Sequence, residues 1–175
     1  MLKGCSELLQ RLRKSSGRKV SVIGWSLGGI YAREIAKENP EDVRCVITLG
    51  TPLTADPDAT NASSLYRLLN GDEISDSRWA HLKDPPPVPT TSIYSRTDGI
   101  VAWQSSVQTA GPLSENIEVE ASHIGLGVHP AALYAVADRL SQHEAEWQPF
   151  DRTGLRQFFY RDPDVSDWLP STWLL

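Results

Sequence analysis

The segment of residues 20–31, VSVIGWSLGGIY, holds the residue types and spacing that most clearly could do chemistry. Its centre, GWSLG at residues 24–28, places Ser26 between an apolar, β-branched run and an amphipathic segment. A serine on a very tight turn from strand to helix projects its hydroxyl toward solvent, where it can act as a nucleophile. Bulky residues two positions away on either side would clash in such a turn. We therefore expect Gly24 and Gly28 to remove those clashes.

The helix expected after Ser26 offers a second chemical feature. Its N-terminal amides and dipole point toward the oxygen that gains negative charge when a carbonyl is attacked. The amide of Leu27, directly after the serine, is the expected first donor to that oxyanion. Trp25 and Trp103 are candidates to contact an apolar substrate, although Trp103 could equally lie in the core.

A serine nucleophile needs a general base, and the base needs a carboxylate to orient it. When a parallel sheet is covered by helices, residues that face ligands lie at the carboxyl ends of the strands. Asp98 follows the apolar run 91–95, and His123 follows the run 117–120. We therefore expect Ser26, Asp98 and His123 to form a triad in the chain order Ser, Asp, His.

The other histidines and several aspartates are weaker candidates for these roles. His81 lies in a polar insert, where a surface position is expected. His129 precedes Pro130 at a helix start and is expected to be a capping or structural residue, and His143 is expected to be solvated. Three further aspartates lie in loops without a strand directly before them: Asp56, Asp58 and Asp84.

Alternating strands and helices must position these side chains. The predicted strands are Val20–Gly24, Val43–Gly50, Thr91–Ser95 and Ile117–Glu120. The first two are apolar on both faces, which is typical of parallel strands covered by helices. The predicted helices are Met1–Ser16, Gly28–Asn39 and Pro130–Trp147, the last burying Leu133, Val136, Ala137 and Leu140. This alternation indicates an α/β fold with a parallel sheet flanked by helices.

Two segments do not fit the alternation. Residues 53–89 form a long insert that ends in a proline cluster, and such inserts in compact domains are usually lids or binding loops. The segment 148–175 is rich in aromatic side chains, so we expect it to dock on another part of the protein. The chain thus divides into a domain at 1–147, with a lid-like insert at 53–89, and an aromatic-rich tail at 148–175.

Composition excludes several classes of protein. The chain has 175 residues, a formal net charge of -5 and two cysteines, which suits one domain in a reducing compartment such as the cytoplasm. The mild acidity, without a basic block, argues against nucleic acid or an anionic membrane surface as a partner. Mean hydropathy is -0.32 and no apolar run approaches the length of a membrane span. No His/Cys cluster has ligand spacing, so no metal or organic cofactor is implied.

The chain resembles the α/β-hydrolases, in particular their bacterial lipase and esterase branch. The residues that carry the resemblance are VIGWSLGG at 22–29, VITLGTP at 46–52, IYSRTDGIVAW at 93–103 and SHIGL at 122–126. The resemblance covers about residues 17–140, without the insert and the tail. It implies Ser26 as the nucleophile, Asp98 as the orienting carboxylate and His123 as the general base. Lipase-like members also carry a lid insertion where this chain has residues 53–89.

The start of the chain departs from the family pattern. Family members begin with further strands, and the loop after their third strand supplies the second oxyanion donor. Here a helix stands before the strand at Val20–Gly24, so the sequence resembles the carboxyl-terminal half of the fold. That strand is then expected to be an exposed apolar edge, which favours pairing or aggregation. Three explanations stay open: a fragment of a larger hydrolase, a minimal hydrolase whose tail or second copy covers the edge, and a relative that binds without cleaving.

The expected function is hydrolysis of carboxylic esters of small molecules or lipids through an acyl-enzyme. His123 would take the proton of Ser26 and later protonate the leaving alkoxide. A thioesterase or acyltransferase uses the same triad, and the sequence does not separate these from an esterase. A noncatalytic binding module on the half-fold is the alternative outside enzymes. A homo-oligomer paired along the edge at Val20–Gly24 would accompany a self-associating form.

Overall fold

A computed structural model describes residues 2–53, 84–144 and 146–161. Within these ranges the strands β1 (Val20–Trp25), β2 (Val43–Leu49), β3 (Thr90–Tyr94) and β4 (Ser114–Glu118) form one parallel sheet in the order β1-β2-β3-β4. The α-helices are α1 (Leu2–Ser16), α2 (Leu27–Glu38) and α5 (Pro130–Ser141), with 3₁₀ helices η2 (Trp103–Ser106), η3 (Gly125–Gly127) and η4 (Gly154–Phe158). Most of the predicted lid-like insert, residues 54–83, lies outside the described residues.

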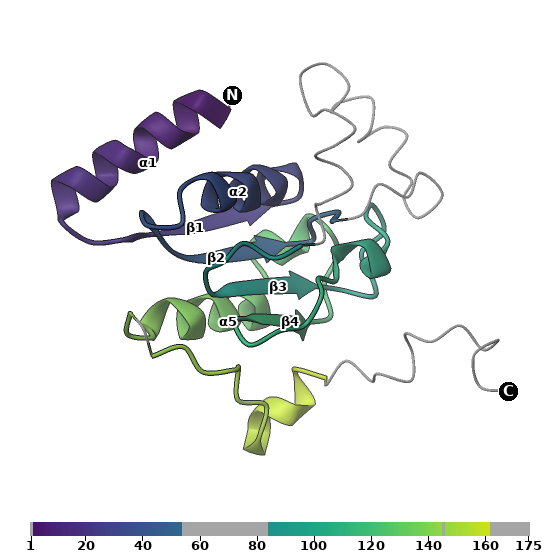
Figure 1. The fold of residues 1–175 in the computed structure, drawn as a ribbon. Coiled ribbons are helices and arrows are strands. Elements are labelled where there is room, and N and C mark those ends of the chain that lie inside the picture. The colour runs from purple at the N-terminus through teal and green to yellow at the C-terminus, as the bar shows by residue number, and fades with distance from the viewer. Residues whose placement is uncertain (1, 54–83, 145, 162–175) are drawn as a thin grey trace, which may run out of the picture.

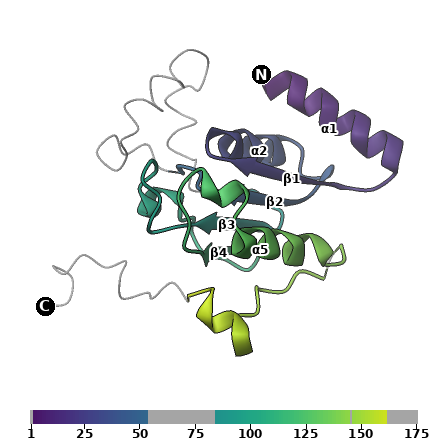
Figure 2. The same cartoon turned by 180° about the vertical axis from the view of Figure 1, so that it is seen from behind.

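Helices cover both faces of the sheet, which confirms the predicted α/β fold (Figures 1 and 2). Successive side chains of a strand point to opposite faces. On β2, Val46 packs in a buried cluster with residues of α1 and α2, whereas Ile47 packs in a second cluster with residues of α5. β2 is therefore covered on both sides, as its apolar sequence predicts.

The first strand, β1, forms one edge of the sheet in the described part of the chain and pairs there with β2. Ile23 and Trp25 are each 45% exposed. The strand is therefore the exposed apolar edge that the sequence predicts, whereas the prediction that helices cover both of its faces is wrong at these two positions. The pairing of two copies along this edge stays a prediction.

The first helix, α1, ends where the sequence predicts. Gly17 adopts a left-handed φ of 68°, and its N–H donates to the carbonyl of Arg13 at 3.0 Å. A glycine in this conformation is a common helix terminator, because it has no Cβ to oppose the positive φ. Arg13 and Lys14 lie in the last turn, where positive charge complements the helix dipole.

The last helix, α5, ends at Ser141 rather than at the predicted Trp147. Arg44 of β2 explains the early end, because its guanidinium donates to the carbonyls of Leu140 (3.0 Å) and Gln142 (2.6 Å). Those carbonyls at the helix end have no partner inside the helix. A cation from a distant strand therefore stabilises the end, and the local sequence carries no sign of it.

The buried face of α5 differs in part from the prediction, which holds for Val136 and Leu140, both packed against the core. Leu133 and Ala137 are exposed, whereas Ala132, Ala135 and Arg139 are buried. Arg139 turns inward because its Nη1 forms an ion pair with Glu115 Oε1 at 2.8 Å. The charged pair, rather than the apolar residues alone, sets the rotation of this helix against the sheet.

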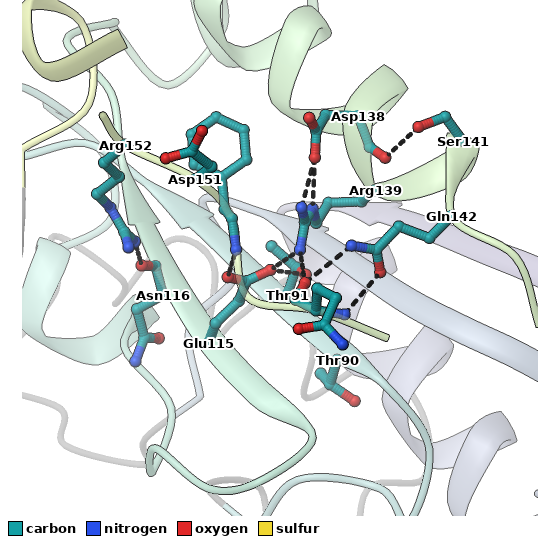
Figure 3. Close-up of polar contacts among 12 residues, drawn as sticks. Thr90, Thr91, Glu115, Asn116, Asp138, Arg139, Ser141, Gln142, Asp151 and Arg152 are labelled. Carbon is teal, nitrogen blue, oxygen red and sulfur yellow. Dashed lines mark hydrogen bonds and ion pairs between the residues drawn. The ribbon is translucent and has the colours of Figure 1, made fainter. Parts of the chain in front are cut away.

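The tail docks on the sheet through this same buried pair (Figure 3). The Glu115 carboxylate accepts hydrogen bonds from Arg139 Nη1 (2.8 Å), Thr91 Oγ1 (3.0 Å) and the backbone N–H of Phe150 (2.8 Å). Arg139 also donates to the carbonyl of Gln148 at 2.6 Å. A buried charge costs free energy unless it is paired and hydrogen-bonded. Here the tail itself supplies two of the partners.

Aromatic packing completes the docking of the tail. Phe150 and Tyr160 are 3% and 4% exposed, and their ring centroids lie 4.6 Å apart in an edge-to-face contact. Arg152 donates to the carbonyl of Asn116 on β4 at 2.6 Å. The expectation of a docked tail is thus confirmed for residues 148–161, although Phe158 and Phe159 remain exposed. The predicted continuation, with its two tryptophans, lies outside the described residues.

A buried arginine fixes the helix that follows Ser26. Arg33 of α2 is fully buried and donates to the side chain of Gln108 and to the carbonyl of Asp84 (3.0 Å). Burial lowers the pKa of the Arg33 guanidinium to about 10, so it stays charged at neutral pH. This contact ties α2 to the proline-rich end of the insert, which leads into β3.

Candidate active site

Ser26 occupies a strained turn between β1 and α2. Its φ of 54° and ψ of -128° make it the one non-glycine residue with positive φ in the described part of the chain. The Ser26 N–H donates to the carbonyl of Leu49 on β2 (2.8 Å), and its own carbonyl accepts from Gly29 in the first turn of α2 (3.0 Å). Such backbone strain persists where the surrounding structure holds it, and it is common at active sites.

The glycines around Ser26 have different roles from those predicted. A Cβ at Gly24 would lie 2.4 Å from the carbonyl oxygen of Gly28, which confirms the expected clash at this position. A Cβ at Gly28 would meet nothing within 4 Å among the described residues, so the expected clash there is wrong. The close approach is instead at Gly29, where a Cβ would lie 1.9 Å from Thr51 Oγ1.

Asp98 and His123 form a short, buried pair. His123 Nδ1 lies 2.7 Å from Asp98 Oδ2, and the two side chains are 6% and 2% exposed. Asp98 Oδ1 accepts the backbone N–H groups of Ile100 (2.9 Å) and Val101 (2.8 Å). The carboxylate is therefore held on one oxygen by its own loop and presents the other oxygen to the imidazole.

This arrangement assigns the tautomer of His123. An ionised carboxylate only accepts hydrogen bonds, so the short contact requires the proton of a neutral imidazole to be on Nδ1. The lone pair is then on Nε2, which is the nitrogen that a general base uses in a serine triad. His123 as placed can accept a proton from a hydroxyl, and the negative charge of Asp98 stabilises the imidazolium that results.

Hydrogen bonds brace the loops that carry Asp98 and His123 against each other. Ser95 Oγ accepts the backbone N–H groups of Thr97 (3.1 Å) and Ala121 (3.0 Å). Thr97 Oγ1 in turn donates to the carbonyl of Ala121 at 3.2 Å. The loops after β3 and β4 are therefore joined at residues that lie just before Asp98 and His123 in the chain.

Trp103 lies beside the loop of Asp98 in a stack of aromatic and charged groups. Its ring stacks on Tyr94 with centroids 5.9 Å apart, and the Arg96 guanidinium lies 4.3 Å from its centroid. Arg96 also pairs with Glu118 at 3.1 Å. Burial, with Glu118 as a second cause, raises the pKa of the Tyr94 phenol well above its ordinary value. A role for Trp103 in substrate binding stays a prediction.

Gly50, at the end of β2, lies directly against the Asp98–His123 pair. Its φ is 52°, and an added Cβ would lie 2.7 Å from Leu126 Cδ1, 3.0 Å from Asp98 Oδ2 and 3.2 Å from His123 Nδ1. The absence of a side chain here lets the two loops close over the sheet. Gly50 was not among the residues predicted for the site, although it lies in the LGTP segment that supports the resemblance.

We predict that Gly50→Ala lowers kcat/KM about 100-fold, because displacement of catalytic groups by about 1 Å has that effect. The free energy of unfolding should fall by about 1–3 kcal/mol from strain and overpacking. Denaturant titration and initial rates measure the two effects. Gly17→Ala is the matched control, since Gly17 also has a left-handed φ, but a Cβ there meets nothing within 4 Å. Equal activity in the two variants would contradict the role given to Gly50.

Trp25 joins the turn at Ser26 to the loop of His123. The indole Nε1–H donates to the carbonyl of His123 at 3.1 Å, and the two ring centroids lie 5.6 Å apart. The structure thus gathers Trp25, Asp98 and His123 at the carboxyl end of the sheet, next to Ser26. Leu27 begins α2 at the same end. The sequence placed Trp25 near the serine but gave no sign of this bond.

The weaker candidates lie elsewhere. His129 is the N-cap residue of α5, but its side chain forms no hydrogen bond that caps the helix. His143 is exposed beyond the end of α5. Asp84 is exposed, while His81, Asp56 and Asp58 lie outside the described residues. In the described ranges, no group of three or more His, Cys, Asp or Glu side chains is placed to hold a metal ion.

The sequence profile described as Alpha/beta hydrolase family matches residues 2–173. The chain belongs to this family. A search of the curated proteins gave no match. Among the described helices, none combines the length and apolar character needed to cross a membrane.

Solved structures of the family's fold resemble the chain. Lipase B of Aspergillus fumigatus has a TM-score of 0.62 at 20% identity, over 80% of this chain and 40% of that one. Rv0554 of Mycobacterium tuberculosis has 0.56 at 15%, over 78% and 69%. A thioesterase domain from the curacin biosynthetic pathway has 0.53 at 14%, over 78% and 70%. At these identities the likeness establishes the fold alone.

Proposed function

We propose that the chain is a serine hydrolase that cleaves carboxylic esters of small molecules or lipids. Ser26 is the nucleophile, His123 the general base and Asp98 the carboxylate that orients the base. The observation that carries this proposal is the buried His123–Asp98 pair, with Nδ1 and Oδ2 2.7 Å apart, joined by Trp25 to the strained turn of Ser26. Strain at a serine and a buried His–Asp pair are costly features that a purely structural role does not need.

The proposed reaction proceeds in two steps. In the first, Ser26 Oγ bonds to the ester carbonyl carbon while His123 Nε2 takes the hydroxyl proton. The tetrahedral intermediate collapses, the bond to the alkoxide breaks, and His123 returns the proton to that leaving group. In the second, His123 removes a proton from water, whose oxygen bonds to the acyl carbon. The bond from that carbon to Ser26 Oγ then breaks, His123 returns the proton to Ser26 Oγ, and the acid is released.

Leu27 is the proposed first donor to the developing oxyanion. Its backbone N–H belongs to the first residue of α2, where amides have no partner within the helix. The helix dipole adds positive potential at the same place. Negative charge that appears on the carbonyl oxygen during attack is therefore stabilised more than the neutral ester, which is what acceleration requires.

The substrate class is proposed as an ester with an apolar acyl group. Trp25, half-exposed beside the serine, offers an apolar surface next to the attacked carbonyl. A thioesterase or acyltransferase would use the same groups with another leaving group or acceptor. The named lipase and thioesterase neighbours support both readings equally, so the leaving group must be decided by assay.

We expect the purified chain to hydrolyse p-nitrophenyl esters and to prefer some acyl lengths over others. The assay compares acetate through palmitate esters with the corresponding acyl thioesters at equal concentration. A larger kcat/KM for the oxygen esters supports the esterase reading, and the acyl-length profile separates an esterase from a lipase. Turnover of thioesters alone would replace the proposal by a thioesterase. Folded protein without turnover of either class would contradict the hydrolase proposal.

A further inference from the structure

We propose that Trp25 is a positioning residue that holds the general base over the nucleophile through the bond from its indole N–H to the His123 carbonyl. This inference rests on the proposed function and deepens it. It gives Trp25 a role in addition to contact with substrate, which is the role that its sequence position predicts. The reason lies in the distance that the His123 loop must bridge.

The sheet order places the two halves of the site far apart. β1, which leads into Ser26, and β4, which precedes His123, lie at opposite edges of the described sheet. Adjacent strands are about 4.8 Å apart, so the two edges are about 14 Å apart. The loop after β4 must therefore reach back across β3 and β2 before an imidazole can serve a hydroxyl on β1.

Most anchors of this loop act on the β3 and β4 side. Ala121 is held by Ser95 and Thr97, and Asp98 holds the ring of His123. These contacts fix the near end of the loop and the ring nitrogen Nδ1. They leave the distance between His123 and β1 to be set by contacts with β1 itself.

Trp25 supplies a contact of that kind. It directly precedes Ser26, so its backbone moves with the turn that carries the nucleophile. Its N–H holds the backbone carbonyl of His123 at 3.1 Å, and the ring centroids lie 5.6 Å apart. One hydrogen bond thus links the residue before the nucleophile to the backbone of the base. Loss of the bond would let the loop drift away from β1 while the Asp98–His123 pair stays intact.

Two substitutions separate the donor from the ring. Trp25→Phe keeps an aromatic ring and removes the donor. Trp25→His keeps a donor in the same place, because imidazole Nε2 occupies the same position from the Cβ as indole Nε1, but it removes the larger apolar ring. A positioning role depends on the donor, whereas a substrate-contact role depends on the apolar ring.

We expect Trp25→Phe to lower kcat about 3- to 10-fold with little change in KM, the effect of one lost hydrogen bond. Trp25→His should restore kcat to within about 2-fold of the parent protein, because it restores the donor. Trp147→Phe is the matched control, with the same chemical change at a half-buried position among Lys19, Pro40 and Glu144. It should leave both constants unchanged. A raised KM at constant kcat, or Trp25→His no better than Trp25→Phe, would overturn the proposal.

A labelling rate tests the contact without relying on ester turnover. A fluorophosphonate reacts with an activated serine oxygen, so its rate of reaction with Ser26 reports how well His123 is positioned over that oxygen. The rate should fall about 3- to 10-fold in Trp25→Phe, return to within about 2-fold of the parent protein in Trp25→His, and stay unchanged in Trp147→Phe. A folded protein that neither turns over esters nor takes up the label lacks the proposed function, whereas labelling of Trp25→Phe at the parent rate would refute the positioning contact itself.

Discussion

Replacement of Ser26 by alanine is expected to lower kcat/KM for p-nitrophenyl esters by about 10⁴- to 10⁶-fold. Ser26 Oγ is the proposed nucleophile that forms the bond to the acyl carbon. Its loss therefore abolishes the acyl-enzyme route rather than weakening it. Initial rates measure the loss, and circular dichroism checks that the variant is folded. Ser15→Ala, at an exposed position on α1, should keep full activity.

The substitution Ser26→Gly tests the strain of the turn through the melting temperature of the protein. The φ of 54° and ψ of -128° cost a non-glycine residue about 1–3 kcal/mol, and glycine avoids most of this cost. The glycine variant should therefore be inactive yet melt about 2–8 °C higher than the parent protein. An inactive variant with a lower melting temperature would show that the turn is not strained. An active variant would show that the nucleophile lies elsewhere.

Replacement of Asp98 by asparagine is the second large effect, with an expected fall in kcat/KM of about 10⁴-fold. The backbone N–H groups of Ile100 and Val101 already donate to one oxygen of Asp98. An asparagine would keep its carbonyl oxygen on those donors and turn its NH₂ toward His123. His123 Nδ1 would then have to accept, which moves the proton to Nε2 and removes the lone pair that the base needs.

The matched control for this change is Asp151→Asn. Asp151 is exposed in the tail, and its carboxylate accepts a hydrogen bond from the backbone N–H of Thr153. In sequence, Asp151 is far from the residues of the candidate site. This hydrogen bond lowers the pKa of Asp151. The control should keep the parent's kcat/KM. A loss of less than about 10-fold in Asp98→Asn, with the control unchanged, would contradict the assigned role of Asp98.

The candidate site could be predicted from the sequence because parallel topology gathers strand ends. Asp98 and His123 lie 25 residues apart, yet each follows the end of a strand. Once the apolar segments before Asp98 and His123 are interpreted as parallel strands, both residues are expected at the carboxyl end of the sheet. The strained turn of Ser26 was predictable in the same way, from a glycine-flanked serine between a strand and a helix.

The remaining features depend on contacts between distant segments. Gly29, not Gly28, is the position without room for a side chain, because Thr51 packs against it from the loop after β2. Arg44 ends α5 early from another strand, and Arg139 sets the rotation of that helix through Glu115. Local periodicity contains none of this information, since each partner is tens of residues away.

The central claim is that Ser26 is a nucleophile activated by the His123–Asp98 pair. A fluorophosphonate tests it most directly, because an activated serine oxygen bonds to its phosphorus and displaces fluoride. Intact mass should rise by one phosphonyl group, and the tryptic peptide of residues 20–33, VSVIGWSLGGIYAR, should carry it. The adduct should be absent from Ser26→Ala and slow to form in Asp98→Asn. Folded protein that takes up no label, or that takes it up outside this peptide, would contradict the account.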